Sequence, residues 1–338
     1  MLIIKKNFSL KKFNTFGINV YTRYFVIIKN IYDLIKIYDQ YIFIPKRILG
    51  NGSNVLFLNN YYPGLIMKME IKGIKIVYET KNKVIVKAFS GENWNNFVEW
   101  TINKGFYGLE NLYFIPGTIG VSPIQNIGAY GVEIKNFILK VEVYDTIKKK
   151  ILELTRKECK FSYRNSIFKK NKNKYLILSV FFILKKNFEK LNINHTDVKE
   201  KINLLKIKNP TSNDLIKIIA SIRKKKIPDP KNIGNAGSFF TNPIVEKNFF
   251  KKLKIRYPNI IGTPIKSMIK ISTNWLIEYV GWKGKRIGDV EIYEKYPIIL
   301  LNHGKANGMQ IYSISEKIIQ DVKKKLGVIL SREVDVIT

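Results

Sequence analysis

The chain has 338 residues, of which 46% are hydrophobic, 25% charged and 13% aromatic. This composition excludes disorder as a description of the whole chain, because disordered chains are poor in aromatic residues. At about 150 residues per domain, the length is enough for two or three domains.

The net charge is strongly positive. Lys and Arg number 59 and Asp and Glu 26, which gives a formal net charge of +33. A basic field attracts phosphate, so nucleic-acid binding is one hypothesis. However, the lysines are spread through the whole sequence, and no RNA-recognition or zinc-finger pattern accompanies them. We therefore interpret the excess as compositional bias that favours anionic small ligands, and we expect no specific nucleic-acid partner.

Cysteine and histidine are too few for several classes of site. The single cysteine, Cys159, excludes an internal disulfide and a thiolate metal cluster. Because His195 and His303 are the only histidines, we expect no metal site. The longest apolar run, 175–184, is too short to cross a bilayer and indicates a buried strand. Since residues 1–16 also lack the apolar segment of a signal peptide, we expect a cytoplasmic protein with no membrane partner.

The first half of the chain alternates short β-type runs with glycine-rich turns. A helix is expected to begin after 90–93 and to end at Gly105, with Trp94, Phe97 and Ile102 on its apolar face. Runs of apolar residues predict strands at 41–48, 55–58, 84–88, 137–145 and 175–184.

The second half is expected to contain two further helices. Residues 185–210, rich in Lys and Asn, predict a connector between domains, and Ser212 begins a helix that stops before Pro228. The last helix carries Ser313 and Glu316 at capping-box spacing.

The end of the chain completes the predicted order of elements. Gly327 ends the last helix, and 328–337 predicts a final strand. Helices and strands in this order indicate an α+β fold of several domains.

The turn Gly50-Asn51-Gly52-Ser53-Asn54 is the first candidate for ligand binding. Its glycines can expose backbone N–H groups in a concavity that suits a pyrophosphate. The turn matches neither the phosphate loop with Gly-Lys-Ser/Thr nor the dinucleotide pattern Gly-x-Gly-x-x-Gly. A strand-to-strand turn without a ligand is therefore an equally good interpretation of this segment by itself.

A long loop at 112–131 is the second candidate. Loops of this length inside a compact domain usually carry function, and small residues let a backbone approach a flat ligand closely. Its polar side chains could bond to a heteroaromatic edge, and a purely structural loop is the alternative. The residues that carry this prediction are Pro116, Gly117, Gly120, Ser122, Pro123, Gln125, Asn126, Gly128 and Ala129.

Three further residues could carry chemistry. Arg164 is either a surface residue or a planar fork for a carboxylate. Ser238 follows Gly237 in a predicted tight turn, and without a histidine base it suits proton donation better than attack on an acyl group; a helix cap is the alternative. Glu333, on the polar side of the last strand, would be catalytic only with a partner from elsewhere in the fold.

In this order and over this length, these segments resemble the UDP-N-acetylenolpyruvoylglucosamine reductases of bacterial cell-wall synthesis, in the longer-chain subgroup called type I. The resemblance runs from about Asn14 to Val336, with 115–131 and 234–242 as its most specific stretches and 185–210 as its weakest. The other matching segments are 14–17, 50–57, 91–94, 108–111, 163–166, 228–230, 275–277 and 333–334.

The resemblance implies a specific version of the α+β fold. It consists of a two-part FAD-binding cradle of the vanillyl-alcohol-oxidase type and a C-terminal α+β substrate-binding domain. We expect the two FAD-binding subdomains at 1–67 and 68–210 and the substrate-binding domain at 211–338. The last strand, at about 328–338, could return to the FAD-binding part.

The resemblance also implies the chemistry. NADPH reduces bound FAD and leaves, the enolpyruvyl UDP-sugar enters the same site, and a hydride passes from flavin N5 to the terminal vinyl carbon. Ser238 would protonate the other vinyl carbon, while Arg164 and Glu333 would polarise the substrate carboxylate. The product is UDP-N-acetylmuramic acid.

Binding roles follow from the same resemblance. The 50–54 turn and the 112–131 loop would hold FAD. Lys226 and Asn242 are candidates for the UDP pyrophosphate or sugar, and Tyr163 for the nicotinamide or enolpyruvyl group. We expect a monomer.

The chain departs from the family pattern at two positions. Asn51 replaces the usual middle glycine, and asparagine tolerates the left-handed backbone expected there. His195 lies where type I members have a substrate-contacting tyrosine and could take its place.

Two alternatives to this function remain. One is another FAD oxidoreductase of the same fold, and the other is a basic nucleic-acid-binding protein without catalysis.

Overall fold

The computed structural model describes residues 2–187 and 191–338. The chain divides into two compact units. Unit 1 consists of 1–8, 22–51 and 63–225, and unit 2 of 9–21, 52–62 and 226–338. Two early segments therefore fold with the C-terminal third of the chain. The expected boundaries at 67/68 and 210/211 stay predictions.

The first sheet of unit 1 has the strand order β1-β2-β5-β3. Its strands are β1 (Ile4–Ser9), β2 (Tyr21–Ile28), β5 (Tyr61–Met69) and β3 (Lys46–Leu49). Helix α1 (Ile31–Gln40) buries Leu34 and Ile37 in the same cluster as Val26 and Leu65. Asn30 caps this helix by accepting a hydrogen bond from Asp33 N, 2.8 Å away.

The predicted strand at 41–48 is therefore wrong in its first half. Tyr41 ends α1, because its N–H donates to Ile37 O at 3.2 Å, and the strand begins only at Lys46. Apolar residues at 41–44 resemble a strand in composition, but the local hydrogen bonds complete a helix and a turn.

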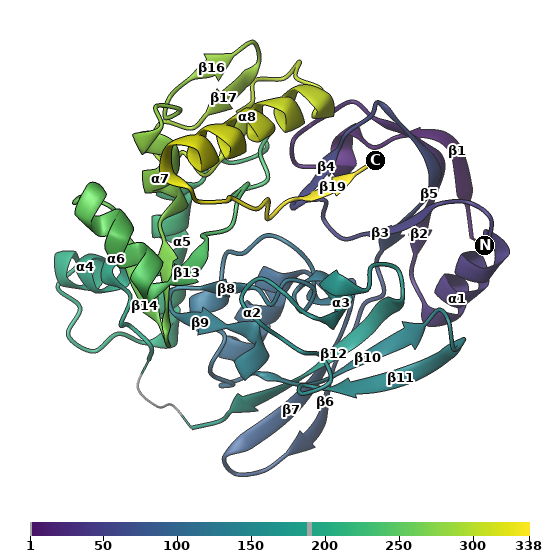
Figure 1. Cartoon of the computed structure of the whole chain (residues 1–338). Helices are drawn as coiled ribbons and strands as arrows, with labels where there is room; N and C mark the ends of the chain where they lie inside the picture. Colours follow the sequence, from purple (N-terminus) through teal and green to yellow (C-terminus); the bar gives the residue numbers. More distant parts are fainter. Residues whose placement is uncertain (1, 188–190) are drawn as a thin grey trace. The chain divides into compact units, whose positions relative to one another are not determined.

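The second sheet of unit 1 carries the five strands β11-β10-β12-β7-β6 (Figure 1). They span β6 (Ile74–Glu79), β7 (Lys83–Phe89), β10 (Ile138–Asp145), β11 (Lys150–Thr155) and β12 (Tyr175–Lys185), which confirms three predicted strands. Helix α2 (Trp94–Asn103) also confirms its prediction. The rings of Trp94 and Phe97 lie 6.2 and 4.9 Å from that of Phe182, so the helix packs against the central strand.

The predicted connector at 185–210 contains a helix, α4 (Thr196–Leu204). Val198 and Ile202, four residues apart, pack with Leu215 and Ile218 of α5 (Ser212–Lys226), whose start confirms the prediction. Two apolar side chains one turn apart are enough to pack a short helix against α5. Among many lysines and asparagines, however, they give too weak a periodic signal for the helix to be predicted from the sequence. Residues 188–190 of this segment lie outside the described part of the chain.

Unit 2 contains small sheets and three helices around a large apolar core. The sheets have the orders β13-β15-β14 and β16-β17-β18, and β19 pairs in parallel with β4. Their strands are β4 (Val55–Phe57), β13 (Ile244–Glu246), β14 (Gly262–Ile265), β15 (Met268–Ile271), β16 (Arg286–Ile287), β17 (Val290–Ile292), β18 (Leu300–Asn302) and β19 (Asp335–Ile337). The helices are α6 (Lys247–Arg256), α7 (Thr273–Tyr279) and α8 (Gly308–Leu326).

The C-terminal elements correct two predictions. The capping box of α8 is formed by Asn307 and Gln310, while Ser313 lies inside the helix; the cap at 307 instead of 313 lengthens the helix by six residues. The last strand is only 335–337, because residues before it bond to loops rather than to a continuous strand. Gly327, left-handed at φ 66, ends α8 as predicted.

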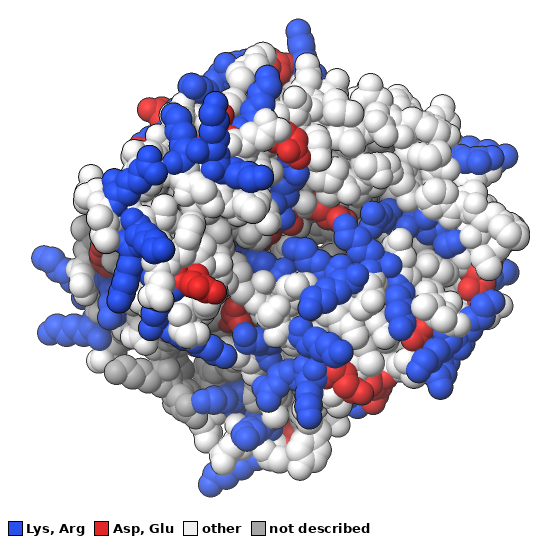
Figure 2. Space-filling view, viewed as in Figure 1, with Lys and Arg blue, Asp and Glu red and all other residues white. Residues whose placement is uncertain are grey.

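The remaining elements are short. They are α3 (Ile167–Lys170), β8 (Gly128–Ala129), β9 (Val132–Glu133) and the 3-10 helices η1 (Lys11–Phe13), η2 (Glu110–Leu112), η3 (Ile119–Val121) and η4 (Ile134–Asn136). Within 2–187 and 191–338, no helix has the length and apolar character that crossing a bilayer requires. Figure 2 shows Lys and Arg side chains scattered over the viewed face rather than gathered in one stripe.

Candidate functional site

The glycine-rich turn at 50–54 has its left-handed residue at Gly52, where φ is +63. A Cβ at this position would lie 2.0 Å from Phe13 O, so only glycine fits. Asn51, which we expected to take the left-handed role, instead donates from Nδ2 to Gly117 O at 3.1 Å. The asparagine therefore connects the first candidate segment to the second.

The loop at 112–131 is held by its own polar side chains. Asn126 is fully buried; its Nδ2 donates to Ser162 O and its Oδ1 accepts from Lys135 N, both at 3.1 Å. Ser122 Oγ donates to Ile119 O at 2.8 Å. These two predicted residues thus fix the shape of the loop, and direct contact with FAD remains a prediction for them.

Arg164 lies in a tight turn that contacts this loop. Ser162 and Asn165 exchange backbone hydrogen bonds of 3.0 and 3.1 Å, which places Arg164 in a left-handed conformation, φ 51. Such a conformation costs a non-glycine residue on the order of 1–3 kcal/mol and often marks a functional position. Arg164 Nη2 donates to Gly128 O at 3.0 Å, so the turn brings the guanidinium onto the second candidate segment.

Two hydroxyls of unit 1 test whether these segments suit FAD. Thr118 and Ser90 are 3% and 1% exposed, and their side-chain oxygens have no hydrogen-bond partner among the described residues. A Cβ on Gly50 would lie 3.2 Å from Thr118 Oγ1, so the glycine keeps space open beside that hydroxyl. A buried hydroxyl without a partner is costly, and a ligand rich in acceptor oxygens would satisfy it. The residues present therefore fit a pyrophosphate-containing cofactor.

Unit 2 brings Ser238 and Glu333 into neighbouring backbone segments. Glu333 N donates to Phe239 O at 2.8 Å, and Phe240 pairs with Arg332 in an antiparallel bridge. Gly237, directly before Ser238, has φ 65, in the left-handed region that favours glycine. Two residues 95 positions apart in the sequence thus lie on paired segments.

The two residues predicted to bind the UDP pyrophosphate or sugar both belong to unit 2 but contact different elements. Lys226 Nζ lies 5.4 Å from the ring centre of Tyr296. Asn242 Oδ1 accepts a hydrogen bond from Thr273 N at 2.9 Å, so this side chain supports the start of α7. Their contact with the UDP-sugar remains a prediction.

Two more predicted residues belong to unit 1. The Tyr163 ring centre lies 5.6 Å from the guanidinium carbon of Arg164, so the tyrosine accompanies the arginine in its turn. The His195 ring contacts that of Tyr130 edge-on at 5.0 Å, directly before α4. The substitution of His195 for a substrate-contacting tyrosine stays a hypothesis.

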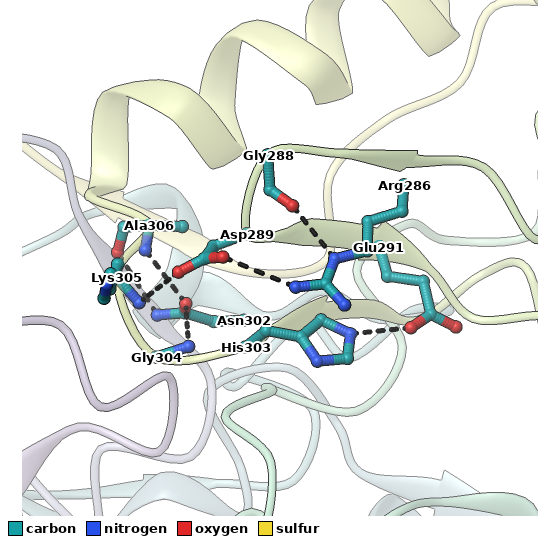
Figure 3. A network of polar contacts seen from close by, with 9 residues as sticks. All are labelled: Arg286, Gly288, Asp289, Glu291, Asn302, His303, Gly304, Lys305 and Ala306. Atoms are coloured by element: carbon teal, nitrogen blue, oxygen red, sulfur yellow. Dashed lines mark hydrogen bonds and ion pairs between the residues drawn. The ribbon is translucent and has the colours of Figure 1, made fainter.

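The second histidine, His303, belongs to a polar network at the end of β18 (Figure 3). Its Nε2 lies 2.7 Å from Glu291 Oε2. In the same network, Arg286 contacts Asp289 at 3.4 Å, and Asp289 Oδ2 accepts from Lys305 N at 2.8 Å. The network joins β17 to the segment after β18 and gives His303 an acidic partner of its own.

Sequence reasoning missed Thr118, Ser90 and Arg332. Thr118 lies inside the predicted loop, but nothing in the sequence distinguishes a partnered from an unpartnered hydroxyl. Arg332 precedes Glu333, and its contacts with α8 depend on a return of the chain that only the fold provides.

Comparison with known families gives two matches that together span most of the chain. Residues 229–337 match the family described as UDP-N-acetylenolpyruvoylglucosamine reductase, C-terminal domain. Residues 23–154 match the FAD binding domain family. These matches confirm the predicted FAD cofactor and the predicted C-terminal domain type.

Similar proteins match over nearly their whole length. UDP-N-acetylenolpyruvoylglucosamine reductase of Flavobacterium johnsoniae is 37% identical, with 99% of each chain covered. Its counterpart in Buchnera aphidicola subsp. Baizongia pistaciae is 43% identical over 97% of this chain and 98% of its own. The one in Pseudomonas aeruginosa is 37% identical, with 98% of each covered.

A solved structure supports the fold. The UDP-N-acetylenolpyruvylglucosamine reductase of Thermus caldophilus superposes with a TM-score of 0.67 at 20% identity, covering 100% of this chain and 99% of its own. The predicted α+β fold is therefore confirmed, and the relatives at 37% to 43% identity confirm the predicted oxidoreductase class. From these relatives and the match of its C-terminal third, the chain belongs to the UDP-N-acetylenolpyruvoylglucosamine reductase family.

Proposed function

We propose that this chain catalyses the NADPH-dependent, FAD-mediated reduction of UDP-N-acetyl-enolpyruvoylglucosamine to UDP-N-acetylmuramate in peptidoglycan synthesis. The observation that carries the proposal is that the two residues directly after Ser238 pair with Arg332 and Glu333, in a chain that belongs to this reductase family. The pairing brings the Ser238 and Glu333 segments into one part of unit 2, and a hydroxyl that donates a proton and a carboxyl that stabilises developing charge both serve the reduction of an enolpyruvyl ether.

In this proposal the 50–54 turn and the 116–129 segment would hold the cofactor. The Thr118 and Ser90 hydroxyls would donate to its acceptor oxygens. When bound, FAD supplies a two-electron, hydride-carrying centre. The Asn51–Gly117 hydrogen bond keeps the two halves of the cradle together.

Ser238 is the proton donor. Its hydroxyl releases a proton to the vinyl carbon next to the carboxylate, after hydride addition at the terminal carbon. Because a serine hydroxyl is a very weak acid, this transfer needs negative charge to build up on the substrate first. Arg164 and Glu333 polarise the substrate carboxylate so that this charge can develop there.

Arg164 is suited to this role by its backbone. Its strained turn and its bond to Gly128 O hold the guanidinium in one place, and a preorganised charge costs no rearrangement during the reaction.

Lys226 and Asn242 bind the pyrophosphate or sugar, and Tyr163 the nicotinamide or the enolpyruvyl group. A cytoplasmic location and a monomeric state belong to the proposal, and light scattering on the purified protein tests the second.

An anaerobic visible spectrum of the purified protein, before and after NADPH, tests the reaction. We expect a flavin spectrum that bleaches with NADPH and returns on addition of the enolpyruvyl UDP-sugar. Bleaching without return would indicate another FAD oxidoreductase of this fold. No flavin binding, even after reconstitution with FAD, would overturn the proposal.

A further inference from the structure

Arg332, the residue before Glu333, is anchored on helix α8. Its Nε donates to Ser315 Oγ at 2.8 Å, and its Nη2 donates to Glu316 Oε1 at 2.6 Å. The guanidinium carbon also lies 4.2 Å from the ring centre of Tyr312. Tyr312, Ser315 and Glu316 stand three and four positions apart, so a single face of the helix receives the whole side chain.

This anchor acts on a segment whose backbone is already paired. Arg332 is bridged antiparallel to Phe240, and Glu333 N donates to Phe239 O. In such extended pairing, successive side chains point to opposite faces. When α8 holds the Arg332 side chain on one face, the Glu333 side chain is directed to the other.

We propose that Arg332 is a positioning residue, which uses α8 to fix the side on which Glu333 presents its carboxyl. The inference rests on the proposed role of Glu333 in polarising the substrate. Through the Arg332 guanidinium, helix α8 would then control the position of a carboxyl that takes part in the reaction.

The contact geometry requires arginine. Arg332 is 16% exposed and uses two nitrogens of its planar fork on two different partners while its face covers a ring. Lysine carries the same charge but has a single ammonium and no planar face, so it cannot make these three contacts together.

The test separates the two half-reactions in rapid-mixing experiments. Flavin reduction by NADPH does not involve Glu333, whereas reoxidation by the enolpyruvyl UDP-sugar does. For Arg332→Met we expect reoxidation to slow by about 10- to 100-fold, the effect of a misplaced catalytic group. FAD content and the rate of reduction by NADPH should stay at wild-type values, and Arg332→Lys should restore reoxidation only in part.

The matched control is Arg286→Met, which breaks the exposed pair with Asp289 in the same unit and should change neither half-reaction. Glu333→Gln and the double variant Arg332→Met/Glu333→Gln complete a cycle. If Arg332 acts only through Glu333, the double variant reoxidises no more slowly than Glu333→Gln.

The outcomes are distinct. Unchanged reoxidation in Arg332→Met, with a slow Glu333→Gln, overturns the positioning role and leaves the proposed function intact. Unchanged reoxidation in Glu333→Gln overturns the role of Glu333 itself. Equal slowing of both half-reactions with a lowered melting temperature would mean that Arg332 only stabilises the fold, and would also overturn the inference.

Discussion

The side-chain amide of Asn54 donates to the backbone carbonyl of Glu333 at 3.2 Å, across 279 positions of sequence. Asp335 N donates in return to Asn54 O at 3.0 Å, where β19 begins to pair with β4. A residue of the glycine-rich turn therefore holds the backbone of the proposed catalytic glutamate. The two segments that the sequence analysis assigned to different roles meet within unit 2.

Asn54→Ala is expected to loosen this connection. Loss of one hydrogen bond should lower the free energy of unfolding by about 1 kcal/mol. Reoxidation of the flavin by substrate should slow more than its reduction by NADPH, because the substitution releases the Glu333 segment. Asn187→Ala, which removes an exposed bond to Asn82, is the control. Equal rates for both variants in rapid mixing would contradict this view of Asn54.

Thr118→Val should affect the apoprotein and the holoprotein in opposite directions. Valine has nearly the same shape without the hydroxyl, so removing a buried group that has no protein partner should leave the melting temperature of the apoprotein unchanged or raise it. The dissociation constant for FAD, measured by quenching of flavin fluorescence, should rise about 10- to 100-fold if the hydroxyl bonds to the anionic pyrophosphate.

The control for this pair of measurements is Thr101→Val. Thr101 is equally buried, but its hydroxyl donates to Val98 O at 2.7 Å. This variant should leave FAD binding unchanged. An unaltered dissociation constant in Thr118→Val would remove Thr118 from the cradle.

Ser238→Ala should separate proton donation from hydride transfer to the flavin. Loss of a general acid typically costs about 10²- to 10⁴-fold, and here the loss should fall on turnover of the enolpyruvyl sugar alone. Bleaching of the flavin by NADPH should be unaffected. Ser221→Ala, at a serine that only bonds to Ile218 O in α5, should behave like the wild type. Full turnover in Ser238→Ala would exclude it as the donor.

The Arg332–Glu316 pair should make stability depend on pH in a specific direction. The hydrogen bond from Arg332 holds the pKa of Glu316 below its ordinary value of 4.5. A lowered pKa in the folded state contributes stability above the unfolded value, and this contribution is lost as the pH falls through the folded one. The melting-temperature difference between wild type and Glu316→Gln should therefore be full at neutral pH and shrink below about pH 4.5.

Glu153→Gln provides the comparison for that experiment. Glu153 pairs with Lys140 at 2.7 Å, but the two side chains are 48% and 31% exposed, so solvent screens the pair. Its substitution should change the melting temperature little at any pH. A Glu316→Gln difference that stays constant from pH 7 downward would mean that the pair does not stabilise the fold.

The single thiol should be inert in the folded protein. Burial raises the pKa of Cys159 to about 12, so the thiolate that reacts with disulfide reagents is scarce at neutral pH. Ellman's reagent should find no reactive thiol in the native protein and one after unfolding, with Cys159→Ser giving the blank. Fast reaction of the native protein would show that the side chain is accessible.

The sequence alone predicted the elements whose signal is local. The helix after Asn93 and the strand at 175–184 follow from periodicity and apolar runs, and Gly327 ends its helix as glycine usually does. The family followed from a resemblance carried by specific motifs, and the FAD cofactor and the class of reaction followed from that resemblance. Weak local signals produced the errors: α4 was missed, and the cap of α8 was placed at Ser313 instead of Asn307.

What only the tertiary structure decided are contacts between distant segments. Asn51 donates a hydrogen bond to Gly117 O and does not adopt the left-handed conformation. The hydrogen bond to Gly128 O orients the Arg164 guanidinium. The segments of Ser238 and Glu333 lie side by side because the chain returns after α8 to pair with residues 239–241. Such pairings depend on the burial of surfaces far apart in sequence. No local propensity encodes them, because each hydrogen bond forms only once the whole unit has folded.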